Sequence, residues 1–151
     1  MTSAHVVLDT GVLGLVTHPS GKSEPRDCKE WLKTQLQQGV SVYVPEIADY
    51  ELRRELLRLD LSSAVARLDS LKSVIGYLPI TTAAMMKAAE FWASARKSGT
   101  PTADPKALDA DVILAAQTFW LARLVNSPVV ATTNVDHLGR FVDARVWQDI
   151  T

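Results

Sequence analysis

The chain is 151 residues long; 47% of them are hydrophobic, 22% are charged, and the formal net charge is −1 with His neutral. This length is typical of one domain, and a high apolar content with little net charge excludes an intrinsically disordered chain, so we expect a single folded domain over residues 1–151. A near-neutral total does not exclude nucleic acid as a partner, because acidic residues elsewhere can balance a basic surface.

The predicted elements alternate between strand and helix for most of the chain. Apolar periodicity and turn residues predict, in chain order, a strand over 5–8, a helix from 27 to a stop at Gly39, a strand over 40–44, helices over 45–59 and 61–71, a strand over 74–80, a helix capped by Thr81 or Thr82 and running to 95, a loop over 97–105, a helix over 108–124, and strands over 128–132 and 145–147. Strands separated by helices pair in parallel with right-handed crossovers. The expected fold is a three-layer α/β domain with a central, mostly parallel twisted sheet.

Polar side chains follow three of these strands. Asp9 ends the first strand, the segment 46–51 follows the second, and Asn134 and Asp136 follow the strand over 128–132. Ligands of such sheets bind beyond the carboxyl ends of the strands, so these side chains share the edge where a site is expected. Ordinary turn formation by Asp and Asn is the simpler interpretation of each residue taken singly.

Glu51 and Glu55 fall on the apolar face of the predicted helix over 45–59. At 100° per residue, both lie within the arc that contains Ile47 and Leu56. A carboxylate among apolar side chains destabilises a protein unless it is paired or coordinates a cation. The alternative is that Glu51 or Glu55 forms an ion pair with an arginine at the edge of the helix.

Asp111 shares a helix face with apolar residues such as Leu114, whereas Asp109 lies about 200° away on the same helix. A regular helix therefore cannot direct both aspartates at one site. If the helix begins at Pro105, Asp104 is its N-cap and Asp109 faces solvent; a later start lets Asp109 itself cap the helix near the site. We favour Asp111 as the functional residue.

Carboxylates that converge without a matching cluster of bases repel one another. Such a cluster favours a hard divalent cation with oxygen ligands, Mg²⁺ or Mn²⁺. In phosphodiester hydrolysis this cation activates the attacking water and neutralises developing negative charge. The sequence therefore favours metal-dependent chemistry at the sheet edge.

Four short motifs, in this order, resemble the acidic motifs of PIN domains, particularly those of VapC-type toxins from toxin–antitoxin pairs. They are Val7-Leu8-Asp9-Thr10, Glu51-Leu52, Asp111-Val112-Ile113-Leu114-Ala115-Ala116 and Thr132-Thr133-Asn134. The resemblance spans nearly the whole chain and implies a Mg²⁺- or Mn²⁺-dependent endoribonuclease. It also implies a homodimer and, often, a small antitoxin protein that occupies the active-site groove.

By position, the resemblance implies specific roles. Asp9, Glu51 and Asp111 are the expected catalytic metal ligands, and Asn134 is the fourth catalytic member of the site. We expect these second-sphere or RNA-binding residues around them: Thr10, Asp109, Thr132, Asp136 and Arg54. Arg53, Arg58 and Arg140 are further candidates for contacts with the RNA backbone, although solvated charges are the simpler interpretation.

Two positions depart from the family pattern. Gly11 stands where the family most often has Asn or Ser, and Asn134 replaces a possible carboxylate. These departures leave a second interpretation open, in which the domain is a catalytically degenerate RNA-binding or protein-interaction module. Thermal stabilisation by Mg²⁺ or Mn²⁺ discriminates between the two, because a true ligand cluster binds the ion in the folded state.

Other features narrow the functional class. With one cysteine, no basic leader and no run of about 20 apolar residues, we expect a cytoplasmic protein that does not enter the membrane. The chain contains no phosphate-binding glycine motif, which disfavours nucleotide cofactors. The tryptophans at 31, 92, 120 and 147 lie in apolar-periodic segments and predict packing in the core or at a homodimer interface near Phe91 and Trp92.

Overall fold

The computed structural model describes residues 4–19, 21–98 and 105–151. In chain order, the elements are β1 (His5–Leu8), α1 (Thr10–Thr17), α2 (Ser23–Gln37), β2 (Ser41–Pro45), α3 (Glu46–Arg58), α4 (Ser62–Lys72), β3 (Gly76–Leu78), α5 (Thr82–Lys97), α6 (Pro105–Leu121), β4 (Val129–Thr132), β5 (Ala144–Val146) and the 3₁₀ helix η1 (Trp147–Asp149). An α-helix follows each of β1, β2 and β3, β4 leads to β5 without an intervening helix, and η1 follows β5 directly.

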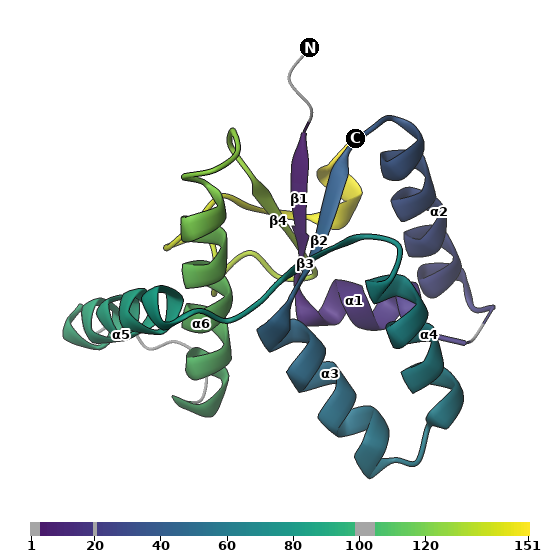
Figure 1. The fold of residues 1–151 in the computed structure, drawn as a ribbon, viewed down its shortest axis with the longest axis horizontal. Coiled ribbons are helices and arrows are strands. Elements are labelled where there is room, and N and C mark those ends of the chain that lie inside the picture. Colours follow the sequence, from purple (N-terminus) through teal and green to yellow (C-terminus); the bar gives the residue numbers. More distant parts are fainter. Residues whose placement is uncertain (1–3, 20, 99–104) are drawn as a thin grey trace.

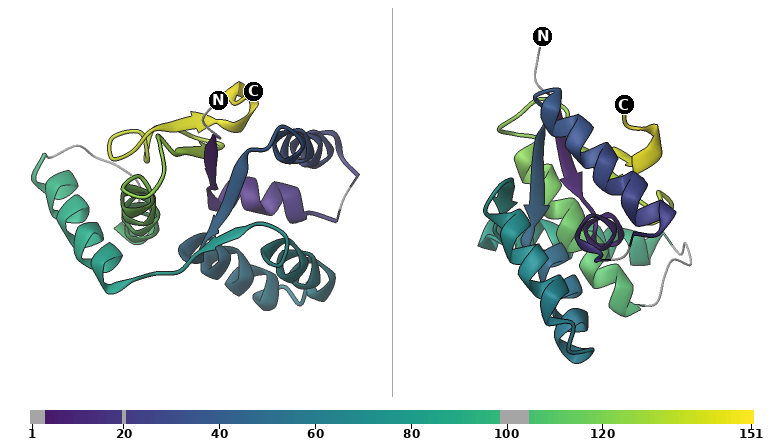
Figure 2. Two further views of the ribbon diagram at one scale, coloured as in Figure 1. Left: turned by 45° about the horizontal axis from the view of Figure 1, so that its top comes forward. Right: turned by 90° about the vertical axis from the view of Figure 1, so that its right-hand side faces the viewer.

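The strands form one sheet in the order β3-β2-β1-β4-β5, and every pairing is parallel. Helices α1 and α2 lie on one side of the strands, and α5 and α6 lie on the other (Figures 1 and 2). The prediction of a three-layer α/β domain with a parallel sheet is confirmed. The central strand β1 is buried along most of its length, with Val6, Val7 and Leu8 at most 1% exposed.

The pairing of β1 with β4 determines where the site lies. Leu8 is opposite Ala131 in the parallel register, and the Asp9 amide continues the pairing by donating to the Ala131 carbonyl at 3.0 Å. Because β2 pairs with β1 in the same direction, the residues after Leu8, Pro45 and Thr132 emerge at one edge of the sheet.

Helix α1 begins directly after Asp9, where the sequence indicated only a polar turn. Its eight residues include two glycines and four β-branched residues, which are poor helix formers. Burial of Val12 and Leu13 and the Asp9 N-cap stabilise the helix in spite of this composition. Tertiary packing therefore outweighs local propensity at this position.

Several boundaries differ from the expectations. Helix α2 begins at Ser23 rather than near 27, because Pro25 is tolerated within its first turn, while Gly39 follows its end at φ +82° as expected. Helix α6 begins at Pro105 and ends at Leu121, three residues before the expected end. Most of the expected 97–105 loop, with Asp104, lies outside the described residues.

The tryptophans divide into two pairs. Trp31 and Trp147 pack edge to face at 5.9 Å between ring centroids, and the Trp31 Nε1 donates to the Ile150 carbonyl at 2.8 Å. Trp92 and Trp120 are each 38% exposed. Core packing therefore accounts for the first pair, whereas the second pair leaves aromatic surface on α5 and α6.

Candidate functional site

Asp9 is the N-cap of α1 and lies at the carboxyl end of the central strand. Its Oδ1 accepts a hydrogen bond from the Thr10 amide, and its Oδ2 accepts one from the Thr132 hydroxyl, each at 2.7 Å. Burial raises the pKa of Asp9 above its ordinary value and outweighs both hydrogen bonds and the charge of His137, which act in the opposite direction. The side chain is thus fixed in orientation while its charged form is destabilised.

Glu51 comes to the same edge from α3. It is half-buried, and its Oε1 accepts a hydrogen bond from the Thr10 hydroxyl at 2.7 Å. Thr10 therefore links the Asp9 and Glu51 carboxylates, using its amide for one and its hydroxyl for the other. The sequence placed Thr10 beside the site without indicating this double contact.

Glu55 does not face inward, contrary to the helical-wheel expectation. It is exposed and forms an ion pair with Arg58, one turn further along α3. The alternative of pairing with an arginine at the helix edge therefore holds for Glu55. The reason is that the covered arc of α3, which contains Ile47, Leu52 and Leu56, is narrower than the wheel assumes and leaves Glu55 in solvent.

Asp111 is half-buried on α6 and accepts no hydrogen bond from another described residue. Burial, followed by the negative charge of Asp9, raises its pKa to about 6, with a further contribution from Glu51 and an opposing one from His137. Asp109 is exposed, because α6 already begins at Pro105. The structure therefore brings Asp111, and not Asp109, into electrostatic contact with Asp9.

The segment after β4 forms a tight polar turn. The Thr132 hydroxyl accepts from the Asn134 amide, and the Asn134 Oδ1 accepts from the Asp136 amide at 3.0 Å. This is the Asx turn that the simpler interpretation predicted. Asn134 and Asp136 are both exposed, so this turn holds Thr132 against Asp9 while its own polar side chains face solvent.

We call Asp9, Glu51 and Asp111 the acidic cluster. Asp9 follows β1, Glu51 lies on α3 and Asp111 lies on α6, and the negative charges of Asp9 and Glu51 both act on Asp111. Within residues 4–19, 21–98 and 105–151, no three His, Cys, Asp or Glu side chains are arranged to hold a metal ion as they stand. The cluster therefore has the carboxylate oxygens that a divalent cation prefers, but these oxygens are further apart than the ligands of a bound ion.

The α3 arginines differ in their availability. Arg53 forms ion pairs with Asp49 at 3.0 Å and Asp69 at 2.7 Å, and Arg58 is paired with Glu55. Arg54 forms no ion pair with a described residue; its guanidinium lies over the ring of the exposed Tyr50, 5.2 Å from the centroid. Arg54 is therefore the α3 arginine available for a phosphate.

Sequence reasoning missed Asp49, a buried carboxylate two residues before Glu51. Its oxygens accept from Arg53 Nε at 3.1 Å, from Lys72 Nζ at 2.8 Å and from the Tyr77 hydroxyl at 3.4 Å. These contacts join α3 to α4 and β3. The i, i+4 spacing of Asp49 and Arg53 was the available signal, and full pairing makes Asp49 structural rather than part of the acidic cluster.

Gln117 was also missed. It is 4% exposed, donates from Nε2 to the Leu78 carbonyl at 2.6 Å, and accepts from the Ile47 amide at 3.4 Å. The Ile47 amide lies in the first turn of α3, where helix donors lack partners and Pro45 supplies no side-chain cap. Gln117 thus holds the helix that carries Asp111 against the helix that carries Glu51.

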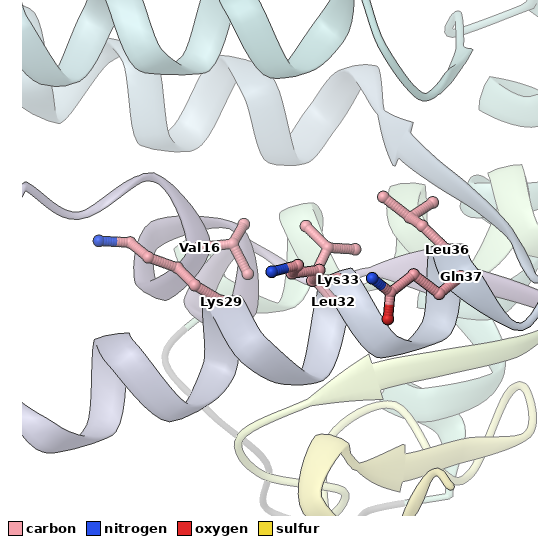
Figure 3. A pocket seen from close by; sticks show the side chains of 6 residues that line it. All are labelled: Val16, Lys29, Leu32, Lys33, Leu36 and Gln37. Carbon is pink, nitrogen blue, oxygen red and sulfur yellow. The ribbon is translucent and has the colours of Figure 1, made fainter.

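A hollow of about 440 Å³ lies between α1 and α2, away from the acidic cluster. Figure 3 shows its lining, with Val16, Leu32 and Leu36 as the apolar side chains and Lys29 and Lys33 as the charged ones. None of the sequence-predicted site residues lines this hollow.

Comparison with known proteins identifies the class that this fold and site define. The family model of the PIN domain matches residues 6–140, and the chain belongs to this family. No curated protein sequence is significantly similar to the chain. In the part of the chain that the structure describes, no helix combines the length and apolar character needed to cross a lipid bilayer.

Solved structures of VapBC complexes have the same fold. The chain resembles VapBC2 from Rickettsia felis, bound to a DNA fragment from its promoter, with a TM-score of 0.72 and 14% identity over 95% of this chain and 98% of that one. It resembles DNA-bound VapBC from Salmonella typhimurium with a TM-score of 0.70 and 18% identity over 95% and 98% of the two chains. It also resembles VapBC-1 from nontypeable Haemophilus influenzae, with a TM-score of 0.64 and 14% identity over 96% of this chain and 99% of that one.

Proposed function

We propose that the protein is a Mg²⁺- or Mn²⁺-dependent endoribonuclease that hydrolyses RNA phosphodiester bonds and acts as the toxin of a toxin–antitoxin pair. The observation that carries this proposal is the acidic cluster at the carboxyl edge of a parallel sheet, in which the charges of Asp9 and Glu51 both act on Asp111. Membership of the PIN family and the likeness of the fold to VapBC complexes support it.

The donor set fits a hard divalent cation. Asp9 is held by two hydrogen bonds and Glu51 by one, which leaves lone pairs on their oxygens, and Asp111 accepts no hydrogen bond from the described residues. Burial raises the pKa of Asp9 and of Asp111, and the negative charges of Asp9 and Glu51 raise the pKa of Asp111 further, so the ionised forms of both aspartates are destabilised. A bound cation compensates that charge, and when bound it supplies Lewis-acid activation of water.

The chain's own residues would then orient the cluster and the substrate. Thr10 and Thr132 hold the Glu51 and Asp9 carboxylates in fixed orientations. Arg54 lies one turn after Tyr50 and next to the Glu51 turn of α3, and its guanidinium, which forms no ion pair with a described residue, suits a phosphate of the RNA backbone. His137 adds positive charge near Asp9 and Asp111 when protonated.

The direct experiment compares wild type with Asp9→Asn in an assay of RNA cleavage at varied Mg²⁺ and Mn²⁺. We expect metal-dependent cleavage by wild type, no cleavage by the variant, and a weaker thermal stabilisation of the variant by the ion. Full metal-dependent cleavage by Asp9→Asn would refute the assignment of the acidic cluster.

An antitoxin partner is the second part of the proposal. The similar solved structures are complexes of VapBC pairs. In this chain, the hollow between α1 and α2 combines an apolar floor with Lys29 and Lys33, which suits an apolar segment that also carries acidic residues. Thr10 and Val16 lie about 9 Å apart along α1, so about three extended residues would carry such a segment from the hollow to the acidic cluster.

A homodimer is the third part. Helices α5 and α6 border a hollow of about 440 Å³ whose lining includes Met85, Ala88, Trp92 and Val112. Met85 is 45% exposed and Trp92 38% exposed, so apolar surface remains uncovered there in the single chain. We propose that a second copy covers this surface.

A catalytically degenerate binding module is the alternative, because the Asn134 amide oxygen is already used within its own turn and the described carboxylates are not spaced to hold an ion as they stand. Unchanged thermal stability of wild type in Mg²⁺ and Mn²⁺, together with RNA binding without cleavage, would favour this module over the nuclease.

A further inference from the structure

Three threonines surround the acidic cluster, and two of their hydroxyls have assigned partners. Thr10 donates to Glu51 and Thr132 donates to Asp9, each at 2.7 Å. The third, Thr133, is exposed, and its hydroxyl forms no hydrogen bond with another described residue. Of these three hydroxyls, only that of Thr133 has a hydrogen free for a ligand.

The Thr133 side chain lies against the backbone of Gly11, where a side chain at position 11 would crowd it. A Cβ built on Gly11 would lie 3.0 Å from the Thr133 Oγ1 and 3.4 Å from its Cγ2, closer than side-chain contacts normally come. Glycine is an unfavourable choice in a helix, and α1 already contains poor helix formers. The bare backbone at Gly11 therefore has a specific consequence, which is room for the Thr133 side chain.

Both residues of this contact are near neighbours of the Asp9 carboxylate along the chain or through a hydrogen bond. Gly11 is in the first turn of α1, whose N-cap is Asp9, and Thr133 directly follows Thr132, which donates to Asp9. The acidic cluster consists of groups that only accept hydrogen bonds when ionised, and a phosphate oxygen is also an acceptor. A hydroxyl donor at this position is complementary to a phosphate that approaches the cluster.

We propose that the Thr133 hydroxyl, which lies against the backbone of Gly11, binds a phosphate oxygen of the RNA backbone beside the acidic cluster. This inference rests on the proposed nuclease function, in which a cation offsets the carboxylate charges that otherwise repel the phosphate. Thr133 is then a substrate-binding residue whose hydroxyl contributes to RNA affinity and not to the fold.

The test compares Thr133→Val, which keeps the shape and loses the hydroxyl, with Thr133→Ser, which keeps the hydroxyl. We expect Thr133→Val to lower kcat/KM for RNA about tenfold, mainly through KM, because it removes one hydrogen bond to a charged group. Thr133→Ser and the surface control Thr34→Val on α2 should stay near wild type, and all variants should keep the thermal stability of wild type.

RNA binding gives a readout that does not depend on cleavage. In an Asp9→Asn background, we expect Thr133→Val to weaken the binding of a fluorescently labelled single-stranded RNA of randomised sequence about tenfold, measured by anisotropy. Wild-type cleavage and binding that persist unchanged in Thr133→Val would refute the role of Thr133 and leave the nuclease intact. A wild type that neither binds nor cleaves RNA would refute the nuclease and, with it, this role.

A double-mutant cycle tests the link to Gly11. Gly11→Ala should reduce RNA cleavage in the wild-type background, because the new Cβ displaces the Thr133 hydroxyl. The same substitution should cost little more once Thr133→Ala has removed both close atoms. Equal losses in the two backgrounds would show that Gly11 acts independently of Thr133 and would overturn the proposed contact.

Discussion

The hydroxyl of Thr132 donates to the Asp9 carboxylate at 2.7 Å across 123 positions of sequence. The same hydroxyl accepts from the Asn134 amide, so one side chain joins the end of β1, the end of β4 and the turn that follows. The orientation of Asp9 therefore depends on the parallel pairing of two strands and on an Asx turn. This dependence explains how a chain with short, individually weak motifs positions a carboxylate at the centre of the sheet edge.

The stability of the metal-free protein should depend on Asp111. Its pKa of about 6 in the folded state exceeds the ordinary value of 3.8, so between these pH values the folded state binds more protons than the unfolded state, and stability falls as pH rises. Above pH 6, Asp111→Asn should be more stable than wild type by about 1–2 kcal/mol, allowing for solvent screening of this half-buried group. Urea unfolding of both proteins at pH 4 and pH 7 measures the difference, which should be much smaller at pH 4, close to the unfolded-state pKa of 3.8. Equal stabilities at pH 7 would contradict the origin assigned to the pKa shift.

Asp109 provides the matched control for the role of Asp111 in activity. The two aspartates lie two residues apart on α6, but Asp109 is exposed and Asp111 faces Asp9. We expect Asp111→Ala to lose at least about a hundredfold in kcat/KM for RNA, and Asp109→Ala to stay within a fewfold of wild type. A larger loss in Asp109→Ala than in Asp111→Ala would mean that α6 presents the other face to the substrate.

The sequence was sufficient to predict the sheet and to place Asp9 and Asp111 near each other, because both follow from strong local patterns; the role of the acidic cluster stays a prediction. Apolar β-branched runs predict the strands, and polar side chains at the ends of parallel strands must share an edge. The helical wheel separated Asp111 from Asp109 because α6 is regular from Pro105 onward. For Glu55 the same wheel was wrong, because the fold covers a narrower arc of α3, with Leu52 and Leu56 against the core and Glu55 in solvent.

Features that depend on tertiary packing could not be predicted from the sequence. Helix α1 has poor intrinsic propensity and exists because Val12 and Leu13 are buried against the sheet. In the sequence, Gln117 is a single polar residue in an apolar helix. Its two backbone partners, Ile47 on α3 and Leu78 on β3, lie far away along the chain. The contact of Thr133 with Gly11 likewise required knowledge of the register between β1 and β4.

Arg54 should contribute to RNA binding, and Arg58 on the same helix provides its control. Arg54 is free of ion pairs with described residues, whereas Arg58 is paired with Glu55. We expect Arg54→Gln to weaken RNA binding about threefold to thirtyfold and to reduce its dependence on salt, since one phosphate contact is lost. Arg58→Gln should leave the RNA affinity and its salt dependence nearly unchanged. Anisotropy titrations over a range of KCl concentrations make the comparison, and equal effects of the two substitutions would rule out a specific phosphate contact at Arg54.

The uncovered surface of α5 and α6 should determine the oligomeric state. Met85 and Trp92 line the hollow between these helices, whereas Met86 is 67% exposed on α5 and lies outside it. A charged side chain at Met85 or Trp92 would be desolvated in a dimer, so Met85→Glu and Trp92→Glu should produce monomers and Met86→Glu should not. Sedimentation equilibrium at micromolar concentration measures the change. Monomeric wild type at that concentration would contradict the proposed dimer.

Expression without a partner should arrest growth, and the acidic cluster should be the cause. A ribonuclease with an accessible cluster degrades the RNA of its host unless another molecule blocks it. A blocking protein would most simply place an Arg or Lys among Asp9, Glu51 and Asp111, where charge-assisted hydrogen bonds are strong and where the base competes with the cation. Growth arrest should therefore disappear with Asp9→Asn or Glu51→Gln, while added Mn²⁺ should weaken the complex with the partner in a binding assay. Thr34→Val, an exposed substitution on α2, should remain as toxic as wild type. If wild-type expression leaves growth and bulk RNA unchanged, the toxin proposal fails, and a catalytically degenerate binding module becomes the better proposal for the function.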